Sequence, residues 1–365
     1  MKIAPAIELA AGADLSVVPE TPAVFLLWAG AGEPHMARTT LLRRRLRRLL
    51  GDSRWASLRG VIERIEYWPV ASTLASATTF YELARQHFPD SYLQRTRLRM
   101  PAYLKLAGHS AFPRTQVTTR LTAGAESIFF GPFRARSAAE EFEKQALDFF
   151  QIRRCQEDLA PSPDHPGCIY GEMNMCMRPC QEVVGEAEYA TEALRAREFF
   201  STRGQSLLGA VGHARDRASE NLDFEEAARQ HKRFDKVQSL IRSLDEPVVE
   251  LSQMNGAAVC RSTAAGAVEL RFLLRGVWLE PRDFTIAGAG VSMDARLREM
   301  AALLEPLKVT ARERQEHLAL LSRWLYSSWR DGEWLQFESL ETLPYRKLVR
   351  SISRVAGGEN LSLFG

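Results

Sequence analysis

Four cysteines lie within 26 residues of this chain, whereas the rest of the chain holds only Cys260. They are Cys155, Cys168, Cys176 and Cys180, separated by twelve, seven and three residues. Four thiolates complete the ligand set of a tetrahedral zinc ion or of a [4Fe–4S] cluster. Structural zinc sites usually draw their cysteines from two close pairs, and here only the last two cysteines are close. The spacing favours a cluster, with zinc or unligated buried thiols as the alternatives.

The composition is that of an ordinary globular chain of 365 residues, 45% hydrophobic and 25% charged. No run of eighteen apolar residues occurs, which predicts no transmembrane helix and no membrane partner. The first residues do not resemble a signal peptide. We therefore expect a cytoplasmic protein, in which clustered cysteines indicate metal binding or catalysis rather than disulfides.

Positive charge is concentrated near the N-terminus. Between residues 38 and 66 there are nine arginines and three acidic residues, although the whole chain carries a formal charge of only +3. Such a block is typical of a phosphate-binding face. Five of these arginines fall on a helical pattern at 39–51 that contains no acid, and they can follow a DNA backbone without reading its sequence. The predicted DNA-binding residues are Arg38, Arg43, Arg44, Arg45, Arg47 and Arg48. A solvated helix face is the alternative.

The periodicity predicts an α+β, multi-domain chain. Strand patterns at 21–28 and 59–70 and helical patterns at 39–51 and 72–88 indicate a small α/β domain. A β-pair is predicted over 101–124, a helix over 137–155, and long helices over 185–220 and 225–244. A β-hairpin over 266–286 turns at Arg275–Gly276. The predicted parts are a loose lead-in at 1–20, an α/β domain at 21–98, the four-cysteine module at 99–185, a helical hairpin at 186–245 and a mixed C-terminal domain at 246–365.

Several stretches resemble UvrC, the nuclease subunit of bacterial nucleotide excision repair. The segment PGCIYGEMNMCMRPCQEVVGEAEYATEA has the cysteine gaps, the proline before the last cysteine and the following acidic helix of that family. Three further stretches resemble segments of that family and occur in the same order along the chain. They are AYLKLAGHSAFPRTQVTTR at 102–120, FFGPF at 129–133 and ENLDFEEAARQHKRFDKVQSL at 220–240. The resemblance covers residues 20–245. It implies a [4Fe–4S] cluster on the four cysteines.

The resemblance also implies a GIY-YIG nuclease domain over residues 21–98, with degenerate motifs. The GIY tyrosine falls on Phe25, the YIG tyrosine on His35 and the helix arginine on Arg43. The metal-binding glutamate falls on Phe80, two residues before Glu82. Because phosphoryl transfer depends on a correctly placed metal ion, we expect an inactive nuclease with a vestigial Arg43. The alternative is an active one-incision endonuclease that binds Mg²⁺ or Mn²⁺ through Glu82, with His35 as a substitute base.

The segment at 220–240 resembles the UVR motif, through which UvrC pairs with a UvrB-like protein. Asn221 and Asp223 are expected to cap the second helix while Leu222 and Phe224 tuck under it. The predicted partner-binding residues are Asn221, Leu222, Asp223, Phe224, Ala227 and Ala228. An ordinary helix–turn–helix is the alternative for this stretch alone.

The resemblance weakens after residue 245. UvrC proteins continue with an RNase H-like nuclease and helix–hairpin–helix motifs, and we expect this chain to lack complete versions of both. The overall expectation is a DNA-repair protein that binds DNA and a UvrB-like partner and does not cut. A zinc-stabilised interaction scaffold is the third possibility.

Overall fold

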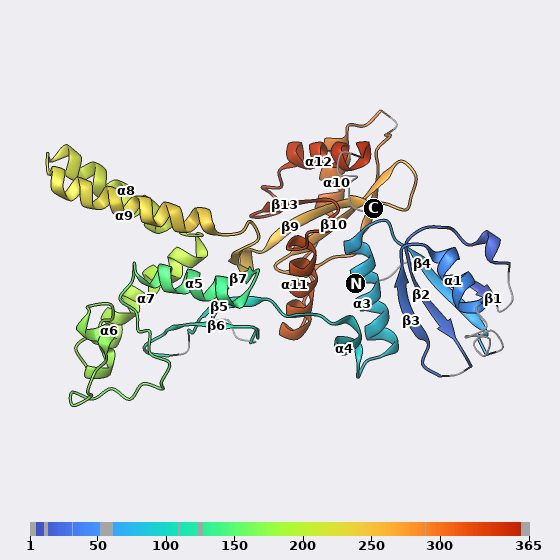
Figure 1. Cartoon of the computed structure of the whole chain (residues 1–365). Coiled ribbons are helices and arrows are strands. Elements are labelled where there is room, and N and C mark those ends of the chain that lie inside the picture. Colours follow the sequence, from blue (N-terminus) through green and yellow to red (C-terminus); the bar gives the residue numbers. More distant parts are fainter. Residues whose placement is uncertain are drawn as a thin grey trace. The chain divides into compact units, whose positions relative to one another are not determined.

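The computed structural model describes residues 5–10, 14–30, 32–51, 61–108, 110–122, 127–288 and 290–358 (Figure 1). These residues form helices and antiparallel sheets, which confirms the predicted α+β class. The chain divides into two compact units. Unit 1 comprises Met1–Arg99, Asn255–Lys308 and Ala319–Gly365, and unit 2 comprises Met100–Met254 and Val309–Leu318.

The N-terminal sheet of unit 1 has four strands in the order β1-β4-β2-β3. They are β1 (Ile7–Ala10), β2 (Ala23–Trp28), β3 (His35–Thr39) and β4 (Arg64–Pro69). The prediction of a loose lead-in over residues 1–20 is wrong at β1, because Ile7 pairs with Tyr67 of β4. This edge strand has no fully buried residue, so its apolar pattern is weak.

Alternate residues of β2 enter two different cores, as the two-residue period of a strand requires. Phe25 packs with Leu42 and Leu46 of α1 (Leu42–Gly51) on one face. Leu26 packs with Leu83 of α3 (Thr73–His87) on the other. The short helices of this region are η1 (Leu15–Val17) and α4 (Tyr92–Thr96).

The C-terminal sheet of unit 1 has the order β11-β10-β9-β13, with β12 paired to β10. Its strands are β9 (Asn255–Arg261), β10 (Ala267–Leu274), β11 (Val277–Trp278), β12 (Arg282–Thr285) and β13 (Glu333–Phe337). The predicted hairpin turn is confirmed, because Arg275 and Gly276 both have positive φ between β10 and β11. Helices α10 (Met293–Ala302) and α12 (Tyr345–Gly357) pack against this sheet. Helix α11 (Ala311–Leu325) has residues in both units.

Unit 2 is built on a sheet with the order β6-β5-β7-β8. The strands are β5 (Ala102–Leu106), β6 (Thr115–Thr118), β7 (Ile128–Phe133) and β8 (Val249–Glu250), followed by η4 (Leu251–Gln253). The predicted β-pair is confirmed by the pairing of β5 with β6. Stacked phenylalanines from β7, α5 (Arg136–Leu147) and α7 (Glu186–Ser201) form the core. The rings of Phe130 and Phe142 lie 5.3 Å apart, and Phe142 stacks on Phe199 at 6.4 Å.

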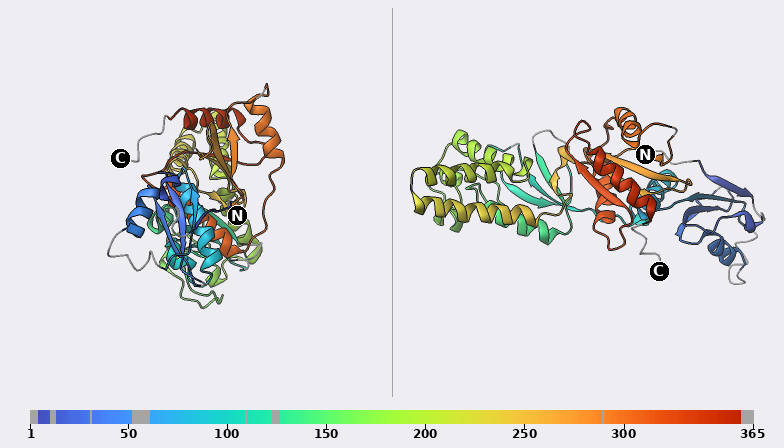
Figure 2. Two further views of the ribbon diagram at one scale, coloured as in Figure 1. Left: turned by 90° about the vertical axis from the view of Figure 1, so that its right-hand side faces the viewer. Right: turned by 90° about the horizontal axis from the view of Figure 1, so that it is seen from above.

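The long helix predicted over 185–220 is wrong. The structure divides it into α7 and α8 (Gln205–Glu220), because Arg203 and Gly204 both adopt positive φ. Any side chain at Gly204 would collide with Ile241, whose Cγ1 lies 2.7 Å from the position of a Cβ atom. The helical hairpin therefore consists of α8 and α9 (Phe224–Ser243), which lie side by side in Figure 2.

Candidate functional site

The four clustered cysteines come from irregular backbone in unit 2. Cys155 follows the loop after α5, Cys168 caps the N-terminus of α6 (Ile169–Glu172), and Cys180 lies in η3 (Pro179–Gln181). All four are free thiols. Cys176 and Cys180 are buried, Cys155 is half-buried and Cys168 is exposed. The patch is thus closed on one side and open to solvent on the other.

The thiols are close enough to influence one another. Burial raises the pKa of Cys176, and the negative charges of Cys155, Cys168 and Cys180 raise it further. Burial also raises the pKa of Cys180, with Cys168 and Cys155 adding to the effect. Four thiolates without a cation therefore repel one another in this patch, and bound metal would relieve that repulsion.

Nearby N–H groups donate hydrogen bonds to the cysteine sulfurs. The Arg178 backbone N–H donates to Cys176 Sγ at 3.4 Å, and Arg153 Nη1 donates to Cys155 Sγ at 3.6 Å. The backbone N–H groups of Cys180 and Gln181 lower the pKa of Cys180 against the effect of burial. Hydrogen bonds to sulfur are a usual part of iron–sulfur sites.

Across the parts of the chain that the structure describes, no three His, Cys, Asp or Glu side chains converge tightly enough to hold one metal ion. A four-iron cluster bonds each thiolate through its own iron, so its ligands surround a larger body than one ion. Four mutually interacting thiols with N–H donors to sulfur fit such a group.

Helix α7 anchors the chain that enters the cysteine patch. The buried Tyr189 hydroxyl accepts from the Arg153 backbone N–H at 2.7 Å and donates to the Pro113 carbonyl at 2.9 Å. Glu192 Oε1 accepts from the Gln151 N–H at 2.8 Å. The buried Arg153 guanidinium donates to the carbonyls of Phe112 and Glu157, both at 2.9 Å. These residues position Cys155, and spacing arguments about the cysteines alone could not identify them.

The positions predicted from the nuclease motifs lie in different surroundings. Phe25 is fully buried in the core between β2 and α1, so it faces no substrate. His35 is classed as an exposed residue of β3. Its pKa is lowered, first by the partial burial of its ring and then by the positive charges of Arg45 and Arg95. Phe80 on α3 lies beneath Arg38, whose guanidinium carbon is 4.7 Å from the ring centroid. An aromatic–cation pair thus occupies the position assigned to the metal-binding glutamate.

The arginines of α1 do not form one continuous face. Arg43 Nε donates to the Val18 carbonyl at 2.6 Å and lies 3.9 Å from Glu20. The charges of Arg47 and Arg43 both act on Asp14. Arg44, Arg45 and Arg48 instead line a cavity of about 640 Å³ together with Arg38. Helical geometry explains the division, because residues 43 and 47 share one side and residues 44 and 48 share the next. Arg54 and Arg59 of the basic block lie outside the described residues.

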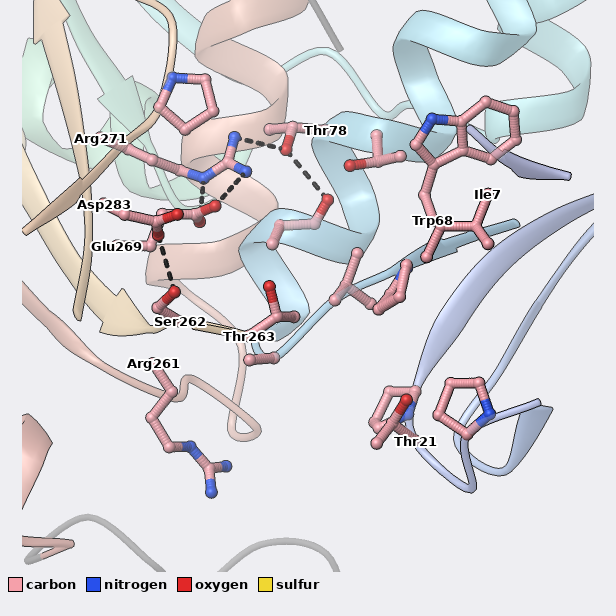
Figure 3. A pocket seen from close by; sticks show the side chains of 18 of the residues that line it. Ile7, Thr21, Trp68, Thr78, Arg261, Ser262, Thr263, Glu269, Arg271 and Asp283 are labelled. Carbon is pink, nitrogen blue, oxygen red and sulfur yellow. Dashed lines mark hydrogen bonds and ion pairs between the residues drawn. The ribbon is translucent and has the colours of Figure 1, made fainter. Parts of the chain in front are cut away.

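A larger cavity of about 1460 Å³ lies within unit 1 (Figure 3). Glu82 is one of its lining residues. Other charges on that wall are already paired. Arg271 binds Glu269 through Nε at 2.6 Å and donates to Thr78 Oγ1 at 2.7 Å. Asp283 accepts from Ser262 at 2.7 Å. The described residues do not place Glu82 in a set of metal ligands.

The tip of the α8–α9 hairpin exposes apolar side chains. Asp223 is the N-cap of α9 and accepts from the Glu226 N–H at 3.0 Å, as predicted. Asn221 ends α8 and does not cap α9. The expectation that Leu222 and Phe224 tuck under the helix is wrong, since they are 71% and 69% exposed. Leu222 has a φ of 59°, which turns the chain sharply between the helices. Ala227 is half-buried and Ala228 is exposed on the first turns of α9.

Residues 102–199 match the family model described as the UvrC/Cho excinuclease middle domain. This segment runs from β5 into α7, and it includes all four cysteines and the Tyr189 anchor. Over this segment the chain is similar to the UvrC family. UvrABC system protein C of Nitratidesulfovibrio vulgaris is 27% identical over 288 residues, which are 76% of this chain and 41% of that protein. The protein of the same name from Moorella thermoacetica is 24% identical over 326 residues, which are 85% of this chain and 52% of that protein.

The UvrC-family match therefore extends beyond the middle domain. This chain spans about half the length of the curated relatives that it matches. No solved structure matches it. None of the described helices is both long enough and apolar enough to cross a membrane.

Proposed function

We propose that this UvrC-family chain acts in nucleotide excision repair as a protein that binds DNA and a UvrB-like partner without cutting DNA itself. The observation that carries the proposal is the match of residues 102–199 to the UvrC/Cho middle domain, because that segment holds the four cysteines and their anchoring residues. The relatives are named as components of a UvrABC system. A chain similar to them over three quarters of its length is expected to serve the same process.

We propose a [4Fe–4S] cluster on Cys155, Cys168, Cys176 and Cys180. Its support is the set of four interacting thiols and the N–H donors to Cys176 and Cys155. When bound, the cluster would add four metal–sulfur bonds to a loop segment that contains few regular elements. Anaerobic purification followed by iron and zinc analysis tests the assignment. Absorbance at about 400 nm with iron supports it; stoichiometric zinc without iron contradicts it.

The proposal that the protein does not cleave DNA is supported by the side chains around β3 and α3. Phe25 is buried, and Phe80 carries the Arg38 guanidinium where a metal carboxylate is expected. The described residues of this GIY-YIG-like domain gather arginines and hold no set of metal ligands, and a domain of that kind would lack the Lewis acid on which phosphoryl transfer depends. Incubation of the protein with nicked and intact duplex DNA in Mg²⁺ or Mn²⁺ tests this. Incision that disappears in a Glu82→Gln variant would restore the endonuclease alternative.

The UvrB-like partner is proposed to bind at the hairpin tip. Leu222 and Phe224 are exposed apolar residues beside small residues on α9, and a partner that covers the tip would bury both side chains. The Phe224→Ser variant should lose capture of purified UvrB. A Leu194→Ser variant is the matched control, because Leu194 is also an exposed apolar side chain in unit 2. Equal loss in both variants would contradict binding at the tip.

A further inference from the structure

The cavity between β3, α1 and the beginning of α3 has an unusual lining. Its charged residues are all arginines, no carboxylate lines it, and most of the remaining polar residues are small hydroxyls. The arginines are Arg38, Arg44, Arg45 and Arg48, and the hydroxyl residues are Thr39, Thr40, Ser72, Thr73 and Ser76. Guanidinium groups and hydroxyls are the side chains that bind phosphate oxygens most effectively.

The positive charges of this cavity are not neutralised within the described residues. Arg44, Arg45 and Arg48 form no ion pair with any described carboxylate, although α1 carries other arginines that do contact acceptors. Burial, and then the charge of Arg323, lowers the pKa of Arg38. Like charges held this close destabilise the protein unless an anion binds between them.

The start of α3 contributes little free hydrogen-bonding capacity. The Thr73 N–H donates to Asp331 Oδ2 at 2.7 Å, and the Ala75 N–H donates to the Ser72 hydroxyl at 3.0 Å. Asp331 thus already satisfies the helix end and places one negative charge nearby. An anion in the cavity would be held mainly by the guanidinium groups.

Arg38 is held in place by an aromatic ring rather than by an acid. Its guanidinium carbon lies 4.7 Å from the centroid of Phe80, a distance typical of a cation–π contact. Such a contact orients the guanidinium and leaves its N–H donors unneutralised. The residue pair therefore provides a fixed positive charge on the side of the domain where a nuclease holds its metal ion.

We infer that this cavity binds the DNA phosphodiester backbone without a divalent metal ion, with Arg38 on Phe80 supplying the fixed positive charge. The inference rests on the proposed function and deepens it, because it names the contact surface and its independence from metal. Arg44, Arg45 and Arg48 hold the neighbouring phosphate oxygens. We expect binding to be independent of base sequence, because contacts to phosphate oxygens carry no sequence information.

The test is fluorescence anisotropy of a short labelled DNA duplex with the full chain. Titrations are made over a series of salt concentrations, in EDTA and in Mg²⁺ at matched ionic strength. We expect the same affinity in both. Arg48→Gln should weaken binding about tenfold and reduce the slope of log affinity against log salt by about one. Arg47→Gln is the matched control, because this neighbouring arginine does not line the cavity. Phe80→Leu should weaken binding about two- to fivefold with all charges retained.

Two results separate the inference from the proposed function. If the wild-type protein binds DNA but EDTA abolishes binding, or Arg47→Gln weakens it as much as Arg48→Gln, the cavity assignment is overturned and DNA binding stands. If the wild-type protein does not bind DNA in either condition, the proposed function itself fails. Circular dichroism of each variant verifies that a loss of affinity is not a loss of fold.

Discussion

The Tyr189 hydroxyl connects the core of unit 2 to the first cysteine, so removing it tests whether packing positions the cysteine patch. Tyr189→Phe keeps the ring, which is fully buried and packs edge-on against Phe112 at a centroid distance of 5.3 Å. It deletes the acceptor of the Arg153 N–H and the donor to the Pro113 carbonyl. Both groups then remain buried beside a phenylalanine that cannot bond to them.

The expected magnitude follows from these two bonds. A buried donor or acceptor that loses its partner costs about 1–3 kcal/mol, so two such groups cost about 2–4 kcal/mol together once partial relaxation is allowed. For a unit of this size each kcal/mol lowers the melting temperature by about 2–4 °C. We therefore expect the unit 2 transition to fall by about 4–16 °C. Because Arg153 lies two residues before Cys155, the variant should also lose iron faster to a chelator.

The assay is thermal unfolding followed by circular dichroism, with the decay of absorbance at about 400 nm measured in parallel for the iron-loaded protein. Tyr170→Phe is the matched control. Tyr170 lies in α6 between Cys168 and Cys176, and its hydroxyl makes no hydrogen bond to the described residues. If Tyr189→Phe is no less stable than Tyr170→Phe, the hydroxyl does not support the patch and the reasoning is refuted.

Three further predictions concern other parts of the chain. Burial raises the pKa of Cys260 to about 12, so this thiol should react with a disulfide reagent only after unfolding; reaction in the native protein would contradict its burial. Asp223→Ala removes the N-cap of α9 and should lower the free energy of unfolding by about 1 kcal/mol, as measured by urea titration. The hydrogen bond from Arg354 lowers the pKa of Glu333, so its stabilisation is complete above the ordinary glutamate pKa and disappears as pH falls through the lowered value. The unfolding free energies of wild type and Arg354→Gln should therefore converge in acid, and a constant difference would exclude this linkage.

The elements with strong local signals were predictable from sequence. The continuous apolar run of β2 indicates a strand buried on both faces, and Gly276 permits the left-handed turn that joins β10 to β11. The pairing of β5 with β6 joins two short stretches with strand-like sequences, AYLKL and TQVT. In each case a periodic pattern or a turn residue acts over a few positions, where local sequence is informative.

Features that depend on distant residues could not be predicted in this way. Strand β13 pairs with β9, about 75 residues earlier in the chain, and its short run EWLQF lies among helical patterns. The break between α7 and α8 depends on the approach of Ile241 to Gly204. The division of the arginines of α1 depends on which neighbours face each side of the helix, Val18 and Glu20 for Arg43 and the cavity for Arg48. Charge counting along the sequence treats them as equivalent.

Phe80 stands at the position that the family resemblance assigns to the metal-binding glutamate. Its pairing with Arg38 alters the chemistry of the domain more than the loss of one metal ligand would. A divalent metal site needs surplus negative charge, whereas Arg38 lies over the Phe80 ring and Arg44, Arg45 and Arg48 surround the adjoining cavity. A carboxylate restored at position 80 would form an ion pair with Arg38, because an opposite charge within a few ångströms dominates its electrostatics. The surrounding charge would therefore still repel Mg²⁺. If the inferred cavity binds DNA, the same arginines attract the phosphate backbone, and we expect an affinity for DNA that does not depend on a metal ion.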